Sequence, residues 1–567
     1  MADSDKPGPK KPDISIEQRL LLAFVLMGAV LFVTQYFYKP APPKAIVKQT
    51  EPAKPQQQSA PAPPPDTPKG AAPPSQVVAA PKEELFTIDT ALYRIVFSNR
   101  GAVVQSWQLK KYHDGTGKPL ELVNTAAASK VYYPFSLIFT DQKPATDLNQ
   151  ALYIAKPAPD GLGIDYEFAD GQNTARKSFR FTRNSYLAQL TTEVLQGTAA
   201  VPHLIAWRGG FGDSTVLKAA GNQHAVYFEA ADNKLIQNDS GTAKNGPVSV
   251  TGAYAYAGIE DNFFAAVFLP QDGKSLQLQT LNDPVPTAVD PKTEEPHVGA
   301  AVGGSGQNAF SLFVGPKDLD LMRKVDPRLE SLINFGRWLG FLAKPLFLAL
   351  NWVNDRWVHN YGWSIVVVTI IINFLLLPLK FSSMKSMKKM QVLAPQIAAI
   401  NKKYEGIGLR DPKKADQNAE VMALYKREGV NPAGGCFPMV LQIPFFISFY
   451  TVLTVAIEMR GAQWLWVNDL SQPETLAIRI LPLALIATQF LLQKISPATS
   501  ADPAQQKVMM LMPLMMGFMF YGVSSGLVLY WLTGNVVGMA QQWFFNRAMP
   551  TPAVTETRPV KKKSPRV

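Results

Sequence analysis

Six apolar stretches divide this chain, one near the N-terminus and five in the C-terminal half. The first, residues 20–38, runs for 19 residues without a charge, about the length that crosses a bilayer. It ends in aromatic and basic residues rather than in the small residues of a signal-peptide cleavage site, which favours an uncleaved anchor after a short cytoplasmic segment at 1–19. The later stretches predict five more transmembrane helices, at about 362–380, 437–457, 476–493, 507–522 and 526–546.

Residues 83–320 instead alternate between apolar and polar side chains. In 92–97, Tyr93, Ile95 and Phe97 share one face, and the same period of two resumes after the turn at 99–101. Further segments repeat the pattern: 164–168, 178–182, 186–194, 225–229, 253–257 and 263–269. Many short strands with glycine, asparagine and aspartate turns, and no long helical pattern, predict a large antiparallel β-sandwich.

Two other segments show helical spacing. Residues 327–358 place apolar side chains three and four apart with charges between them, which predicts an amphipathic helix in the membrane interface. A soluble core helix is the alternative, and the apolar stretch that follows favours the interface. Residues 382–428 predict a helical hairpin that turns at 406–412, either a simple coiled hairpin or a docking surface for a partner.

The charge pattern predicts how these elements are placed across a membrane. The chain carries +12, but residues 83–315 hold 18 Lys and Arg against 23 Asp and Glu, so the remainder carries +17. Eleven basic residues fall in 380–428, and the tail at 547–567 is also basic, so both are expected in the cytoplasm. Six spans then put the N-terminus in the cytoplasm and the β domain outside. The linker 39–82, with 13 prolines, is interpreted as a spacer, with a polyproline ligand as the alternative.

The composition offers little catalytic chemistry. A single cysteine, Cys436, excludes an internal disulfide or a CxxC site, and the five histidines lack the HExxH spacing. Glu260 and Asp261 are adjacent carboxylates, but neighbours in a strand point to opposite faces and make a poor acid/base pair. We therefore expect no enzyme activity, no cofactor and no metal.

Isolated polar residues in the expected spans are the candidate functional groups: Thr369, Asn373, Gln442, Gln489 and Asn535. Each could simply hydrogen-bond a neighbouring helix, or together they could line a hydrated groove. No charge lies in the middle of a span, which disfavours an ion-coupled transporter. The fifth span, 507–522, is rich in methionine, which suits varied apolar partners as well as plain core filling.

The sequence NPAGGCFP at 431–438, followed by QIPFF at 442–446, resembles the YidC/Oxa/Alb family of membrane protein insertases. Four other stretches fit this family: 361–364, 419–425, 502–507 and 525–531. The anchor, proline-rich linker and β domain resemble its Gram-negative form, which has a large periplasmic domain.

This resemblance implies a multi-span α-helical membrane protein with six transmembrane helices, a five-helix insertase core at 361–546 and a large antiparallel β-sandwich in the periplasm. It implies insertion and folding of proteins of a Gram-negative inner membrane, through a hydrophilic groove open to cytoplasm and lipid. The implied partners are nascent membrane proteins, the Sec translocon with its accessory subunits, the ribosome through the cytoplasmic hairpin and basic tail, and membrane lipids. A membrane channel or solute transporter is the alternative.

The resemblance also implies the site. Thr369 and Gln442 match groove-lining positions of the family, and the substrate-contacting positions match these residues: Phe437, Pro438, Phe446, Tyr530 and Trp531. Bacterial family members carry an arginine where this chain has Asn373. Either that charge is dispensable here, or Lys380, seven residues later, reaches partway into the groove.

Overall fold

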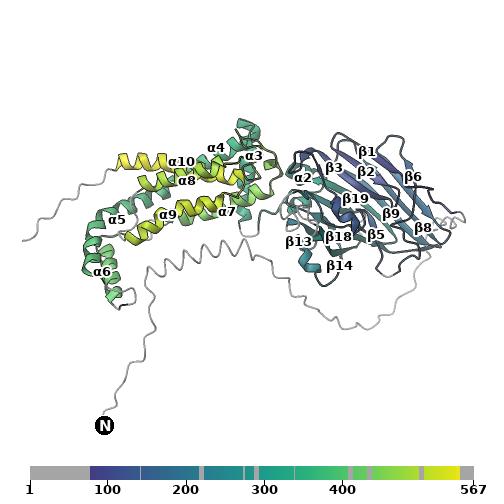
Figure 1. The fold of residues 1–567 in the computed structure, drawn as a ribbon, viewed down its shortest axis with the longest axis horizontal. Helices are drawn as coiled ribbons and strands as arrows, with labels where there is room; N and C mark the ends of the chain where they lie inside the picture. Colours follow the sequence, from purple (N-terminus) through teal and green to yellow (C-terminus); the bar gives the residue numbers. More distant parts are fainter. Residues whose placement is uncertain are drawn as a thin grey trace, which may run out of the picture. The chain divides into compact units, whose positions relative to one another are not determined.

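The computed structural model describes residues 77–549, except for 141, 216–221, 272–274, 287–292, 337–338, 407–410, 412, 431–436 and 497–502. The expected anchor at 20–38, most of the linker, the 431–436 part of the glycine-rich motif and most of the basic tail lie outside the described residues. The chain divides into two compact units (Figure 1). A β unit extends to Gly340 and also includes Thr451–Gly461, and a helical unit holds Phe341–Tyr450 and the residues from Ala462 onward.

The β unit contains three antiparallel sheets, as far as the described residues define them. Their orders are β1-β2-β3-β4, then β13-β12-β15-β16-β19-β9-β8-β7-β6 with β10 beside β9, and β14-β17-β18-β11-β5. The strands are β1 Leu85–Asp89, β2 Tyr93–Ser98, β3 Val103–His113, β4 Pro119–Glu121, β5 Ser136–Ile138, β6 Ile154–Pro157, β7 Gly163–Ala169, β8 Asn173–Phe181, β9 Leu187–Gln196, β10 Ala199–Ala200, β11 His203–Trp207, β12 His224–Glu229, β13 Lys234–Asn238, β14 Val248–Gly252, β15 Tyr254–Glu260, β16 Phe264–Pro270, β17 Leu276–Pro286, β18 Glu294–Ser305 and β19 Gln307–Pro316.

In β2 the structure confirms the predicted alternation of buried and exposed side chains. Tyr93, Ile95 and Phe97 are all buried, and Ile95 pairs with Trp107 of β3 in the antiparallel register. The buried aromatic rings join the sheets: Phe97 lies 5.0 Å from Phe179 of β8, measured between ring centroids. Aromatic side chains on the inner faces of the strands, packed among aliphatic ones, therefore join the sheets in the core of the β unit.

A buried lysine joins two turns of this unit through three backbone carbonyls. The ammonium group of Lys177, on β8, donates hydrogen bonds to the backbone carbonyls of Gly101 at 2.7 Å, Ala102 at 3.2 Å and Phe135 at 2.7 Å. All three residues have positive φ angles, of 71°, 50° and 71°. This conformation is uncommon for Ala102 and Phe135, which carry side chains. Burial lowers the pKa of Lys177 to about 7.

The helical elements of the chain follow the strands. The α-helices are α2 Leu319–Val325, α3 Gly340–Val353, α4 Tyr361–Leu375, α5 Leu377–Lys403, α6 Lys413–Arg427, α7 Phe437–Val455, α8 Ile480–Ile495, α9 Pro503–Phe520 and α10 Ser525–Ala548. Short 3-10 helices lie at Thr125–Ser129, Ser240–Ala243, Pro327–Leu332 and Ile457–Met459, and a π-helical turn follows α3 at Asn354–Val358.

The single interfacial helix expected over 327–358 is divided. Its first part is the 3-10 helix Pro327–Leu332, and Gly336, with φ of 81°, separates this turn from α3. A left-handed glycine ends helical geometry, and the helical spacing of the sequence did not reveal that break. The span expected at 362–380 is likewise interrupted at Leu376, after which α5 runs on to Lys403 as the first arm of the expected hairpin.

No single helix among the described residues combines the length and apolar composition needed to cross a membrane. The segments Gly340–Val358 and Tyr361–Leu375 meet that requirement only as a pair, bent by 114°. Shorter apolar helices lie at Leu441–Val455, Ile480–Ile495 and Met510–Phe520.

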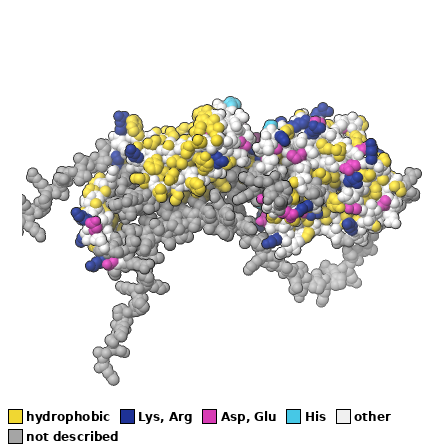
Figure 2. Space-filling model, in the orientation of Figure 1, with side chains coloured by type: hydrophobic (Ala, Val, Ile, Leu, Met, Phe, Trp, Pro, Cys, Tyr) yellow, Lys and Arg dark blue, Asp and Glu magenta, His cyan; other side chains and the backbone are white. Residues whose placement is uncertain are grey.

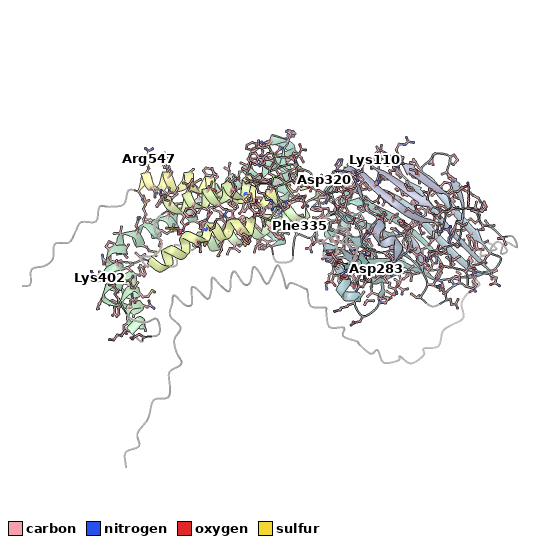
Figure 3. All side chains as sticks on the ribbon, viewed as in Figure 1. Lys110, Asp283, Asp320, Phe335, Lys402 and Arg547 are labelled. Atoms are coloured by element: carbon pink, nitrogen blue, oxygen red, sulfur yellow. The ribbon has the colours of Figure 1, made fainter. Side chains whose placement is uncertain are left out.

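The α5–α6 hairpin expected at 382–428 has its own small core. Its buried side chains are Met390, Leu393, Ile397, Leu424 and Val430. Near the turn, the Glu420 carboxylate accepts a hydrogen bond from Lys403 at 3.0 Å and from the Tyr404 hydroxyl at 3.1 Å. Figure 3 shows Lys402 projecting from this hairpin and Arg547 at the C-terminal end of α10.

Candidate functional site

The polar residues expected on the second span lie in one hydrogen-bonded chain along α4. Thr369 is buried and its hydroxyl donates to the Ile365 carbonyl at 2.6 Å, while Asn373 donates to the Thr369 carbonyl at 2.8 Å. The Asn373 side-chain oxygen accepts from the Lys380 ammonium at 2.5 Å. Gln541 of α10 donates to the Asn373 carbonyl at 3.2 Å, so this polar chain extends from α4 to α5 and α10.

A second cluster joins α7, α9 and α10 through aromatic rings. Measured between ring centroids, Phe446 lies 5.0 Å from Trp531 and 6.1 Å from Phe520, and Phe520 lies 5.1 Å from Trp531. One turn along α7, Phe449 stacks on Tyr530 at 4.1 Å. Phe446 and Trp531 are only half-buried, so this aromatic cluster offers ring surface beyond its internal contacts.

Gln442 belongs to the same part of the unit. Its side chain hydrogen-bonds to the Tyr530 hydroxyl, and its amide nitrogen lies near Gly534 of α10. The structure thus brings Gln442, Phe446, Tyr530 and Trp531 together, and it places Thr369 and Asn373 on another helix packed against α10. Phe437 and Pro438 begin α7, but their side chains lie outside the described part of the chain.

Buried amide oxygens mark three polar positions in the helices, of which the sequence analysis named only Gln489. The side-chain oxygens of Gln489, Gln493 and Gln541 are buried, and none has a hydrogen-bond partner among the described residues. Gln489 and Gln493 lie one turn apart on α8, and Asn535 of α10 donates to Thr488 of α8 at 3.3 Å. Gln541 was missed by the sequence analysis, and the adjacent glutamines at 541 and 542 within the last expected span are the signal that could have drawn attention to it.

One end of the helical unit is closed by the loop between α7 and α8. Within this loop Trp464 is buried and lies 5.6 Å from the ring of Trp363 at the start of α4. Ser525 and Gly526, at the start of α10, donate to the carbonyls of Gln472 and Leu470 at 2.8 and 2.9 Å. The loop therefore binds the N-terminal ends of α4 and α10.

The buried carboxylate of Glu474 completes this closure. It accepts from the Trp466 indole at 2.6 Å and from the Leu481 amide at 2.9 Å. The second bond satisfies one of the free amides in the first turn of α8. A charged side chain thus serves as a helix cap here, at the same end of the helical unit.

One face of the helical unit is largely apolar. Figure 2 shows hydrophobic side chains gathered over this face. The most exposed large ones on α8, α9 and α10 include Leu491, Met510, Leu511, Leu514, Met515, Phe518, Trp543 and Phe544. The most exposed of these residues, Phe518, is 87% exposed. A contiguous apolar surface of this kind is typical of contact with a membrane or with another apolar chain.

The two adjacent carboxylates of the β unit have separate partners. Glu260 forms a buried ion pair with Lys317 at 3.1 Å. Asp261 accepts from the amides of Phe263 and Phe264 at 2.8 and 2.6 Å, and burial raises its pKa to about 6. Each carboxylate stabilises its own turn or pair. Among the described residues, no group of three or more potential ligands is arranged to hold a metal ion.

Comparison with known proteins agrees with the two units. Residues 85–349 match the model described as the YidC periplasmic domain, and residues 352–552 match the 60Kd inner membrane protein. The chain is 33% identical over 563 residues to a membrane protein insertase YidC of Syntrophus aciditrophicus, covering 94% of this chain and all of the relative. A YidC insertase of Cupriavidus pinatubonensis is 34% identical over 84% of this chain and 85% of its own length.

Among solved structures, an active YidC insertase with its first transmembrane domain resolved is similar, with 20% identity and a TM-score of 0.37, over 84% of this chain and 95% of that one. Helices that line a polar interior and expose an apolar surface define a class of membrane-embedded helical proteins. The chain belongs to the YidC family of membrane protein insertases. These relatives do not support the alternative of a channel or solute transporter.

Proposed function

We propose that α10 is the central helix of a client-binding groove. Toward its C-terminal end, α10 reaches the polar chain of Thr369, Asn373 and Lys380 through Gln541. About three turns nearer its N-terminal end, it carries Tyr530 and Trp531, which contact α7 through Phe449 and Phe446. This meeting of a polar row and an aromatic row on one helix is the observation that carries the proposal.

The physical basis is the cost of moving polar groups through hydrocarbon. An unsatisfied backbone or side-chain group loses several kcal/mol there. The buried oxygens of Gln489, Gln493 and Gln541 need hydrogen-bond donors, which water or a polar segment of a client supplies. Polar segments of a client use these groups during transfer, and its apolar segment leaves along α7 and α9 into lipid.

Lys380 gives the groove a positive charge. In the described part of the chain it forms no ion pair, and its side chain donates to the neutral Asn373. A half-buried ammonium bonded to an amide retains an attraction for carboxylates of a client segment. Asn373 and Lys380 together therefore form the polar end of the groove.

The topology follows from the sequence pattern. The anchor at 20–38 and five helices in 361–546 make six spans, with both termini and the hairpin 382–428 in the cytoplasm and the β-sandwich in the periplasm. The negative β unit and the basic hairpin support this placement. The closed end, at Trp464 and Glu474, faces the periplasm. The helical part of the segment expected at 327–358, Gly340–Val358, lies along that membrane surface.

The partners follow from the same arrangement. The α5–α6 hairpin and basic tail meet the ribosome and anionic lipid headgroups, since both present phosphate to exposed lysines such as Lys402. The groove receives nascent membrane proteins in the inner membrane of a Gram-negative bacterium, either directly or beside the Sec translocon with its accessory subunits. The chain works without making or breaking covalent bonds.

The test places a photo-crosslinking residue at Phe446 while ribosomes are stalled on a small membrane protein. Control probes at Leu491, on the exposed face of α8, and at Leu465, in the closing loop, report non-specific contact. We expect crosslinks to the hydrophobic segment of the client from Phe446 and none above background from Leu465. Equal crosslinking from all three positions, or none with several clients, would contradict the groove.

A further inference from the structure

The segment that follows α7 belongs to the β unit rather than to the helical unit. After α7 ends at Val455, the 3-10 helix Ile457–Met459 has both of its apolar ends buried, and the compact β unit includes Thr451–Gly461. The segment is therefore held by the β unit, although its two ends continue covalently into helices α7 and α8.

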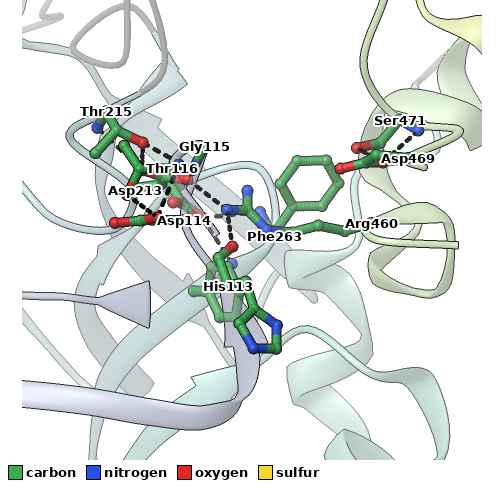
Figure 4. A network of polar contacts seen from close by, with 12 residues as sticks. His113, Asp114, Gly115, Thr116, Asp213, Thr215, Phe263, Arg460, Asp469 and Ser471 are labelled. Carbon is green, nitrogen blue, oxygen red and sulfur yellow. Dashed lines mark hydrogen bonds and ion pairs between the residues drawn. The ribbon is translucent and has the colours of Figure 1, made fainter. Parts of the chain in front are cut away.

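Arg460 makes the polar part of this attachment (Figure 4). Its guanidinium forms an ion pair with the carboxylate of Asp213 and donates to the His113 carbonyl at 2.9 Å. It also lies 5.5 and 5.6 Å from the ring centroids of Phe263 and Phe264. Its side chain is only 8% exposed and that of Asp213 only 4%, so the pair is removed from water. Such a pair leaves a buried, uncompensated charge when either partner is removed.

The β unit orients the groups that surround the Arg460 guanidinium through hydrogen bonds of its own. One oxygen of Asp213 accepts from the amide and hydroxyl of Thr215 at 2.9 and 2.6 Å, and the other oxygen faces Arg460. Asp261 holds the turn that carries Phe263 and Phe264 through two backbone amides. The acceptors and rings that surround the guanidinium are thus oriented by contacts that do not involve it, as in a preorganised binding site.

The charged residues of the loop between α7 and α8 also support this attachment. Between α7 and the start of α8, Arg460 is the single basic residue before Arg479. An arginine beside a membrane commonly reaches toward lipid phosphates. Here that charge is instead directed into the β unit, where an acidic residue neutralises it.

We propose that Asp213 and the Phe263–Phe264 turn form a receptor for Arg460, through which the β domain holds the outer end of α7 in place. Arg460 is then a positioning residue for α7, the helix that carries Gln442 and Phe446. The functional consequence rests on the groove proposed above, whereas the attachment itself does not. Without the attachment, the last turns of α7 move and the groove is less often in its client-binding geometry.

The experiment uses the full-length protein in membrane vesicles. It compares Arg460→Glu, Asp213→Arg, the double variant with both exchanges, and the milder Asp213→Asn. Hydrogen exchange is followed at the amides of 456–461 and of 448–455, and insertion of a small membrane protein is measured in parallel. Arg479→Glu is the matched control, because that exposed arginine contacts Tyr521 outside the β unit.

We expect at least tenfold faster exchange at both sets of amides and at least a threefold loss of insertion in each charge-reversal single variant. The double variant recovers most of both properties, Asp213→Asn is intermediate, and Arg479→Glu leaves exchange at 456–461 unchanged. Unchanged exchange in Arg460→Glu would overturn the attachment. Faster exchange at 456–461 with normal exchange at 448–455 and normal insertion would overturn the positioning role. If the parent protein itself inserts no client, the proposed groove fails, while the exchange data still decide the attachment and its effect on α7.

Discussion

The ammonium group of Lys380 donates a hydrogen bond to the side-chain oxygen of Asn373, seven residues earlier in the chain, at 2.5 Å. The two residues lie on either side of the break between α4 and α5, so the bond joins the end of one helix to the start of the next. Together they place a positive charge beside a neutral amide in the proposed groove. The effect of changing residue 373 therefore depends on the charge of Lys380.

We expect Asn373→Asp to impair insertion more than Asn373→Arg. A carboxylate at this position pairs with Lys380 and cancels the charge that attracts acidic client segments, whereas an arginine adds to it. The loss for Asn373→Asp should be about tenfold in insertion rate, which corresponds to about 1.4 kcal/mol. The measurement is insertion of a client with an acidic translocated tail into vesicles.

Lys380→Gln is the companion variant for this comparison. It removes the same charge without adding a carboxylate, so it should reproduce most of the Asn373→Asp defect. A client with an uncharged tail should be affected less by either change. If Asn373→Arg proves the more harmful exchange, attraction between groove and client is not the role of this pair.

Gly362→Ala should loosen the closed end of the helical unit. A Cβ atom at position 362 would come within 2.2 Å of the Trp464 ring, and Trp464 is buried against the start of α4. The indole must move, which costs about 1–3 kcal/mol of folding free energy in a packed site. Thermal unfolding in detergent and the tryptophan emission spectrum measure the change.

Gly538→Ala is the matched helical control, because its added Cβ would meet Leu492 at an ordinary 3.6 Å. This variant should unfold at the temperature of the parent protein or slightly above it, since the added methyl group fits and alanine favours the helix more than glycine does. Equal destabilisation by both alanines would show that glycine flexibility, rather than the Trp464 contact, sets the effect at position 362.

Asp261→Asn should change how the stability of the β unit depends on pH. Burial raises the pKa of Asp261 to about 6 in the folded protein, above its usual value near 4. Between these two values the folded state keeps a proton that the unfolded state has lost, so stability falls as pH rises from about 4 to 6. Asparagine retains the oxygen that accepts from Phe263 and Phe264 but cannot titrate.

The variant should therefore gain stability relative to the parent protein as pH rises through this window, by up to about 3 kcal/mol. Denaturant unfolding of the full-length protein at pH 4.5 and pH 7.5, followed by tryptophan fluorescence, measures it. Asp160→Asn is the control, because this exposed residue accepts from the Leu162 amide at the protein surface. A pH-independent difference would contradict a buried, titrating Asp261.

Lys177→Met should destabilise the β unit and remove a second pH dependence. The ammonium satisfies three buried carbonyls, and each loses its partner at a cost of about 1–3 kcal/mol before the structure relaxes. The pKa of Lys177 is lowered by burial to about 7, so the folded state holds fewer protons than the unfolded state between pH 7 and about 10. Stability of the parent protein therefore rises over that range.

Denaturant midpoints at pH 7 and pH 9.5 should show this rise in the parent protein and its absence in Lys177→Met. Lys156→Met is the control, since Lys156 is exposed and pairs with Glu167 on the surface. If Lys177→Met is as stable as the control variant, the three carbonyls do not depend on the ammonium group.

Local patterns predicted most of the elements because they record which face of each element is buried. The alternation in β2, the helical hairpin and the apolar helices α7 to α10 all lie close to their expected ranges. Breaks in the backbone were harder to see. Gly336 and Leu376 divide segments whose side-chain spacing is compatible with continuous helices, so periodicity alone could not show the divisions.

The site was predicted in its residue types and less well in its contacts. The possible reach of Lys380 toward Asn373 could be inferred from a spacing of seven residues, which is two helical turns. The bond from Gln541 to Asn373 joins positions 168 residues apart, and nothing in the local sequence of either helix selects that pairing.

By itself the sequence determined the family, the order of apolar and alternating segments, and the types of side chain available to the groove, since these depend on composition and on local periodicity. Only the tertiary structure decided that Lys177 binds the carbonyls of three left-handed residues in two turns and that Arg460 pairs with Asp213, 247 residues away. Such pairs depend on how distant segments pack in three dimensions, and the free energy that selects them is shared by all the contacts of the folded unit.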